Sequence, residues 1–229
     1  MSGSRPEKKP EGKGGGDGDA SGRAARAKKI ARLLIAEHPD ARCMLDHENP
    51  FQLLVATILA AQCTDERVNK VTPALFARFA TPAEMAGAGI AELEELVKST
   101  GFFHNKARSI TGAAGELARR FPGRFPDRME DLVSLPGVGR KTANVVLGTC
   151  FGIPAIIVDT HVRRVAQRLG LALSDDPDEI ERELQALVSR KDWTAFSHAL
   201  TFHGRRRCSA RKPEHSGCVV RSLCDSRDL

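Results

Sequence analysis

The stretch from residue 135 to 144 holds the residues best suited to chemistry. It reads Leu-Pro-Gly-Val-Gly-Arg-Lys-Thr-Ala-Asn and leads from a glycine-rich turn into an apolar helix. Gly137 and Gly139 permit positive φ and a close backbone approach. Their N–H groups, together with the N-terminus of the helix, predict a site for a phosphate group. Taken alone, the turn is explained as well by a tight connection between two helices.

Two ionisable residues strengthen the case for chemistry. Lys141 falls in the first turn of the following helix, where the helix dipole disfavours a positive charge. This position, especially with partial burial, predicts a lowered pKa and a nucleophilic amine. Asp159 opens the next helix and on its own indicates an N-cap. Paired with Lys141, it becomes a carboxylate that can accept a proton or stabilise a developing positive charge.

Candidate metal ligands gather near the C-terminus, whereas the other three cysteines are scattered. The cluster consists of Cys208, His215, Cys218 and Cys224. No apolar leader and no run long enough to span a membrane is found, so we expect a cytoplasmic protein without a signal peptide. In that compartment a terminal cysteine cluster indicates a metal more than disulfides.

Basic residues are concentrated at the two ends of the chain. The net charge is +6, and residues 1–29 and 203–229 each carry +4, which leaves −2 for the middle. This distribution favours a polyanionic partner, with nucleic acid as the first candidate. The alternative is that basic termini only aid solubility.

Helical patterns dominate the elements that must position these residues. Residues 1–23 are polar and rich in glycine and are expected to form a disordered tail, with order beginning near Ala24. Asn49-Pro50 caps a segment that is apolar on nearly all sides, which predicts a buried central helix over 51–62. Alternation with period 2 is nowhere sustained, although 155–158 reads as a short extended segment. We therefore predict an all-α fold of about ten helices.

Several of these motifs together resemble one known family, the helix–hairpin–helix DNA glycosylases, and Lys141 marks its endonuclease III branch. The resemblance runs from Ala24 to the C-terminus, and its motifs lie at 49–51, 61–65, 135–147, 158–161 and 203–205. It implies a helical barrel domain over 45–153 that contains the hairpin. A second, discontinuous domain would combine 24–44 with 154–229 and carry the cysteine cluster. DNA would lie in the cleft between the two domains.

The resemblance implies a bifunctional base-excision repair enzyme, a DNA glycosylase with AP lyase activity. Its partner would be double-stranded DNA with an oxidised pyrimidine or an abasic site, and the enzyme would flip the damaged base out of the duplex. Lys141 would displace the base and form a Schiff base, with Asp159 assisting, before β-elimination cuts the strand. The adenine-specific mismatch glycosylases lack a lysine here, which argues against a monofunctional enzyme. A protein that only binds DNA stays open, and a monomer is the default.

The family resemblance also implies DNA-contact roles for two further residues, and each has a structural alternative. Gln62 aligns with a residue that fills the gap left by the flipped base, and Phe102 aligns with an apolar wedge beside the opposite strand. On their own, Gln62 reads equally as a polar residue at a helix end, and Phe102 as part of the core.

The cysteine cluster departs from the family pattern at one ligand. The family has Cys-x6-Cys-x2-Cys-x5-Cys, which binds a 4Fe-4S cluster, and here the second position is His215. His215 would ligate one iron, or three cysteines would hold a cluster, or the cluster would be labile or absent. A zinc site ranks lower because the six-residue gap is long for zinc. The loop between the first two ligands would present Arg211 and Lys212 to phosphates.

Overall fold

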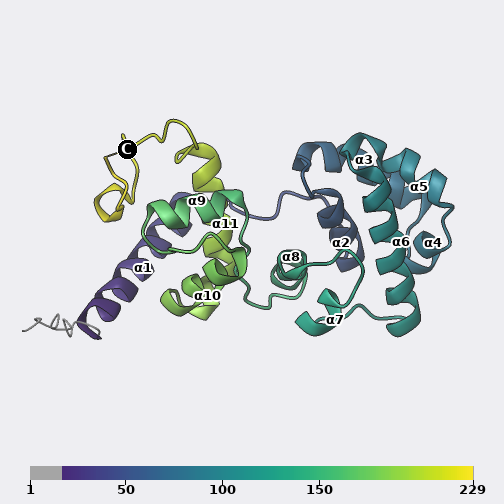
Figure 1. Cartoon of the computed structure of the whole chain (residues 1–229), viewed down its shortest axis with the longest axis horizontal. Helices are drawn as coiled ribbons and strands as arrows, with labels where there is room; N and C mark the ends of the chain where they lie inside the picture. Colours follow the sequence, from purple (N-terminus) through teal and green to yellow (C-terminus); the bar gives the residue numbers. More distant parts are fainter. Residues whose placement is uncertain (1–16, 229) are drawn as a thin grey trace, which may run out of the picture.

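Helices make up all the regular secondary structure in the described part of the chain. The computed structural model describes residues 17–228, and no strand occurs among them (Figure 1). The predicted all-α fold is confirmed. The α-helices are α1 (Asp17–Glu37), α2 (Pro50–Leu59), α3 (Asp65–Arg78), α4 (Pro82–Ala86), α5 (Ile90–Val97), α6 (Phe103–Arg120), α7 (Met129–Val133), α8 (Arg140–Cys150), α9 (Thr160–Arg168), α10 (Pro177–Leu187) and α11 (Trp193–Arg206). Three 3-10 turns lie at Lys98–Thr100, Arg190–Asp192 and Arg221–Leu223.

The first helix begins earlier than the apolar pattern indicates. Residues 1–16 of the expected disordered tail lie outside the described residues, but α1 starts at Asp17 rather than near Ala24. Arg23 donates to the Leu171 carbonyl at 3.2 Å, and Arg26 donates to Asp225 at 2.7 Å. These contacts reach about 150 to 200 residues along the chain, so a local pattern of apolar residues could not reveal them.

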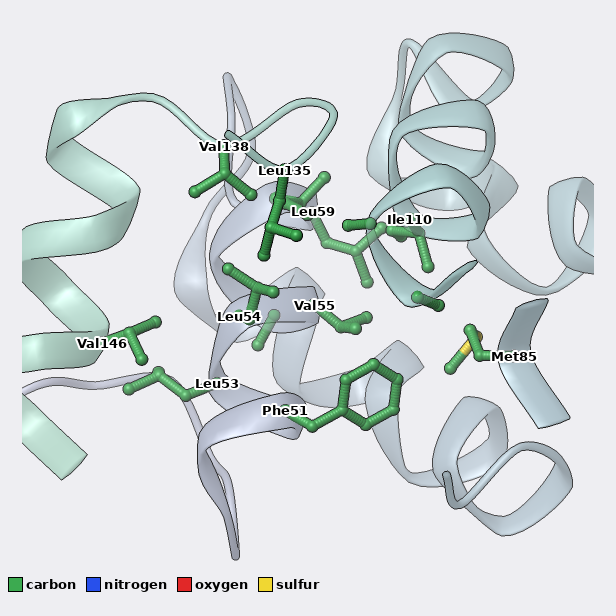
Figure 2. Close-up of a cluster of buried hydrophobic side chains, with 14 of the residues drawn as sticks. Phe51, Leu53, Leu54, Val55, Leu59, Met85, Ile110, Leu135, Val138 and Val146 are labelled. Carbon is green, nitrogen blue, oxygen red and sulfur yellow. The ribbon is translucent and has the colours of Figure 1, made fainter. Parts of the chain in front are cut away.

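Two separate hydrophobic cores organise the helices, and Figure 1 shows them as two groups with α8 near their junction. The first core surrounds α2, whose side chains Leu53 and Leu54 are fully buried among α3–α8 (Figure 2). Because neighbours enclose α2, it needs no polar face. The second core joins α1, α9, α10 and α11 around residues such as Ile30 and Phe196.

A short extended segment runs between the two cores and leads to Asp159. Ile156 and Val158 pack into the second core, whereas Ile157 packs into the first. This alternation is what an extended backbone produces, since successive side chains point to opposite sides. The predicted extended character of 155–158 therefore serves to bridge the two cores.

A buried polar network ties α8 to the second group of helices. Glu181 of α10 is only 3% exposed and accepts two hydrogen bonds from Arg140, at 2.7 and 2.8 Å. Asn144 donates to Glu181 at 3.0 Å and also to the Ile156 carbonyl at 3.0 Å. Bidentate pairing and an amide bridge satisfy the buried carboxylate, which would otherwise be costly. The network fixes α8 against both α10 and the extended segment.

We expect Glu181→Ala to lower the free energy of unfolding by about 2–4 kcal/mol, measured by urea denaturation. The change leaves Asn144 without its carboxylate partner and Arg140 without its ion pair, although Arg140 is 42% exposed and can turn to water. Glu179→Ala, on the same helix but in an exposed pair with Arg182, is the control and should cost less than about 1 kcal/mol. Equal losses in the two variants would contradict the role given to Glu181.

Candidate active site

The hairpin between α7 and α8 is anchored by its apolar side chains and exposes its glycines. Leu135 and Val138 are buried in the first core next to Leu59 (Figure 2). Gly137 and Gly139 are exposed at the surface. Burial of the two flanking side chains holds the turn rigid while its backbone N–H groups face outward, as a phosphate site requires.

The two glycines are needed for different reasons. Gly137 has φ +74°, and a Cβ added there would overlap the Ser109 Cβ. Gly139 has φ −89° and ψ 174° and caps α8, so it does not use the positive φ that glycine permits. A Cβ on Gly139 would meet no atom of the protein within 4 Å. Of the two hairpin glycines, therefore, Gly137 alone has a backbone conformation that requires glycine.

Lys141 and Asp159 come from different helices and line the same cavity, whose volume is about 250 Å³. Lys141 is the second residue of α8, as predicted, but its side chain is exposed rather than partly buried. Asp159 is the N-cap of α9 and accepts from the Val162 N–H at 2.7 Å through Oδ1. Its Oδ2 accepts from the Thr201 hydroxyl at 3.1 Å. The capping role thus uses one oxygen, and the other faces the wall of the cavity.

Helix α11 contributes one wall of this cavity, which sequence reasoning missed. His198, Thr201, Phe202 and Arg205 line it and recur at helical spacing on one face. Burial lowers the pKa of His198, and the nearby Asp159 carboxylate partly opposes this. Arg205 pairs with Asp65 at 2.8 Å at the edge of the site. The spacing of these residues was the available signal, but a surface helix shows the same pattern.

Gln62 and Phe102 share an unusual backbone conformation beside this cavity. Their φ values are 53° and 48°, and among the described residues no other non-glycine has a positive φ. Gln62 lies beyond the end of α2, and Phe102 is 63% exposed, so the core-packing alternative for Phe102 is wrong. Both line a second cavity of about 260 Å³ together with Gly137 and Lys106. Backbone strain of this kind clusters at functional sites.

The four predicted metal ligands surround one small cavity. Cys208, Cys218, Cys224 and His215 line a space of about 20 Å³. The Nε2 atom of His215 is buried without a hydrogen-bond partner in the described structure. Arg168 donates to the Cys208 sulfur at 3.2 Å. Thiol and imidazole groups are the kinds of donor that ligate iron–sulfur clusters. As the side chains stand, no three of the His, Cys, Asp and Glu residues described here converge closely enough to hold a metal ion.

A fifth side chain in this cavity was not predicted. His203 of α11 lies with its Nε2 atom 3.7 Å from the Cys218 sulfur, and its Nδ1 atom is 3.3 Å from His38. Burial, followed by the proximity of His38, lowers the pKa of His203 to about 4. The ring is therefore neutral near pH 7.

Hydrogen bonds from α9 hold the loop between Cys208 and His215. Arg168 donates to the Ser209 and Ala210 carbonyls at 2.7 and 2.8 Å. Arg211 and Lys212 are exposed on its outer side.

None of the described helices combines the length and apolarity that crossing a membrane would require.

Comparisons with known proteins agree with this arrangement. Residues 55–190 match the model of the HhH-GPD superfamily of base excision DNA repair proteins. The endonuclease III of Synechocystis sp. is 54% identical over 202 residues, which cover 88% of this chain and 92% of the relative. The endonuclease III of Escherichia coli is 37% identical and covers 89% and 97%.

Solved structures show the same likeness. A trapped covalent intermediate of an endonuclease III with DNA aligns with a TM-score of 0.84 and 41% identity, covering 89% of this chain and 96% of the other. A thermostable thymine-DNA glycosylase, at 22% identity and a TM-score of 0.81, shares the fold. The chain belongs to the HhH-GPD superfamily of base-excision DNA repair enzymes, and within it to the endonuclease III group.

Proposed function

We propose that this enzyme is a DNA N-glycosylase and AP lyase that removes oxidised pyrimidines from duplex DNA through a Schiff base on Lys141. One observation supports this above the others. Lys141 and Asp159 line one cavity, beside an exposed glycine hairpin, in a chain of the endonuclease III group. An amine, a carboxylate and a phosphate-binding turn are the parts that the reaction needs.

In the proposed reaction, the amine nitrogen of Lys141 attacks C1′ of the flipped nucleoside with its lone pair. The bond from C1′ to the base breaks, and the base leaves with the electron pair and takes up a proton. The amine then loses a proton, the C1′–O4′ bond breaks as O4′ takes up a proton, and the opened sugar is left joined to the lysine as a Schiff base. Loss of a C2′ proton next breaks the C3′–O bond and cuts the strand. Asp159 accepts the lysine proton or stabilises the sugar cation, and its hydrogen bonds from Val162 and Thr201 keep it oriented toward the cavity.

The remaining predicted contacts serve to hold and open the duplex. Gln62 fills the space left by the flipped nucleotide, and Phe102 enters the stack from the exposed end of α6. Gly137 and Gly139 bind a phosphate through their N–H groups. Arg211 and Lys212 contact a second stretch of backbone and should contribute to salt-dependent affinity.

Cys208, His215, Cys218 and Cys224 would hold a 4Fe-4S cluster, which fixes the basic loop in place. His215 is the fourth ligand, and its buried and unpartnered Nε2 atom supports that assignment. Glycosylase chemistry needs no electron transfer, so the cluster has a structural role here.

We also assign the two hydrophobic cores to two domains, 45–153 and 24–44 with 154–229, with damaged DNA between them. The protein acts as a monomer on chromosomal DNA in the cytoplasm. A protein that only binds DNA, with Lys141 as a phosphate contact, is the rival, and a monofunctional glycosylase is a second. Covalent trapping and strand cleavage without heat or alkali separate them.

Borohydride reduction on an abasic-site duplex should give a stable protein–DNA crosslink. Lys141→Ala should reduce the rate of crosslinking by at least about 10³-fold, because the nucleophile is removed. Lys191→Ala, an exposed lysine in the 3-10 turn before α11, is the control and should keep the wild-type rate. An undiminished crosslink in Lys141→Ala would exclude Lys141 as the nucleophile.

The two glycines should separate folding from DNA binding. Gly137→Ala should lower the free energy of unfolding by at least about 1 kcal/mol, because of its positive φ and the Ser109 overlap. Gly139→Ala should cost no more than about 1 kcal/mol of stability but weaken binding of abasic duplex about tenfold, since its Cβ blocks the phosphate. Fluorescence anisotropy measures the binding, and unchanged affinity in Gly139→Ala would remove the hairpin from the interface.

The purified protein should be brown, with broad visible absorption and bound iron. His215→Ala should lose about half of its iron or more, because a neutral methyl cannot replace a ligand. His104→Ala, an exposed histidine paired with Glu94, is the control and should keep its iron. Colourless protein with stoichiometric zinc, or full iron in His215→Ala, would refute this ligand set.

A further inference from the structure

Lys106 is a buried lysine without an acidic partner. It lies in the first turn of α6 and is only 5% exposed. Its amine donates to the Thr100 carbonyl at 2.7 Å, which is one acceptor for up to three N–H groups. Among the described residues Lys106 takes part in no ion pair, and burial lowers its pKa, which the nearby Cys63 partly opposes. A buried amine without a counter-charge costs stability. This cost indicates that Lys106 has a function in binding or catalysis rather than in stabilising the fold.

The surroundings of Lys106 indicate a ligand. With Gln62, Phe102, Asn105 and Ser109 it lines the second cavity, of about 260 Å³. This volume falls just below the range typical of drug-sized ligands and suits a smaller group such as a single nucleobase. Ile58, Ala61 and Phe102 offer apolar surface, whereas the other side chains offer polar groups.

The second cavity adjoins the reaction cavity but is distinct from it. Thr57, Ala61, Gln62 and Thr142 form the shared wall, whereas Lys141 and Asp159 line only the first cavity and Lys106 lines only the second. A nucleotide attached to Lys141 therefore occupies the first cavity. The base that faced it in the duplex has lost its partner and would stand on the other side of Gln62.

We propose that Lys106 is a specificity-determining residue that donates a hydrogen bond to the unpaired base of the undamaged strand, held in the cavity behind Gln62 and Phe102. This inference rests on the proposed function, because it requires a flipped nucleotide opposite. Apolar walls suit the face of a base, and a donor suits an acceptor on its edge. Guanine, which offers O6 and N7, is the base that lysine recognises most often. A backbone phosphate would favour the exposed surface over a site as buried as Lys106.

The experiment measures single-turnover borohydride crosslinking on duplexes that carry the same abasic site. Because the damaged strand has no base, differences can come only from the opposite strand. The opposite position holds guanine or 2-aminopurine, which lacks the O6 acceptor. We expect the wild-type protein to react about tenfold faster opposite guanine, and Lys106→Met to reduce this ratio to about one. Lys98→Met, an exposed lysine paired with Glu95 in the 3-10 turn that precedes α6, should keep the wild-type ratio.

Each outcome has a definite meaning. A purely structural role for Lys106 would lower both rates in Lys106→Met and keep their ratio, which would overturn the inference. If Lys106→Met does not fold, the wild-type ratio decides, and a value of one overturns the inference. A wild-type protein that crosslinks with a ratio of one disproves only the role of Lys106. A wild-type protein that forms no crosslink disproves the proposed function and this inference with it.

Discussion

The site depends on the buried carboxylate of Glu181. Lys141 and Asp159 belong to helices that pack into different hydrophobic cores, so neither core alone fixes the distance between them. Glu181 binds Arg140, the residue before Lys141, and Asn144 links the same carboxylate to the Ile156 carbonyl three residues before Asp159. Hydrogen bonds to a buried charge are strong and directional. They fix the elements that bring the amine and the carboxylate to one cavity.

Several features that lower the stability of the folded protein lie close together, beside the cavity where DNA would enter. Gln62 and Phe102 adopt left-handed backbone conformations, and Lys106 buries an amine without a counter-ion. Each of these costs stability, and the two well-packed cores on either side offset that cost. Such features have no evident benefit to the folded protein alone. Their concentration beside the Lys141 cavity is what a site prepared for a separated duplex requires.

Much of this arrangement could be predicted from the sequence, because helix caps and apolar patterns depend on residues that are close together in the chain. Asn49 before Pro50 caps α2 as predicted, and the apolar residues of 51–59 form the buried central helix. The hairpin and the position of Lys141 also follow from neighbouring residues. The start of α1, the link from Glu181 to Arg140, and the wall formed by His198 and Thr201 depend on contacts between distant residues. A single-sequence pattern can place residues on one face of a helix, as for His198 and Thr201, but it does not show which distant segment that face meets. The left-handed turn at Phe102 is likewise unexpected for a bulky side chain.

The central claim is that the sugar becomes attached to the amine that Glu181 positions opposite Asp159. Peptide mapping by mass spectrometry of the borohydride-reduced complex tests this directly, because it identifies the modified side chain. The account predicts deoxyribose on the peptide that contains Lys141. Deoxyribose on Lys106, the other amine beside the site and the one whose pKa burial lowers, would contradict it.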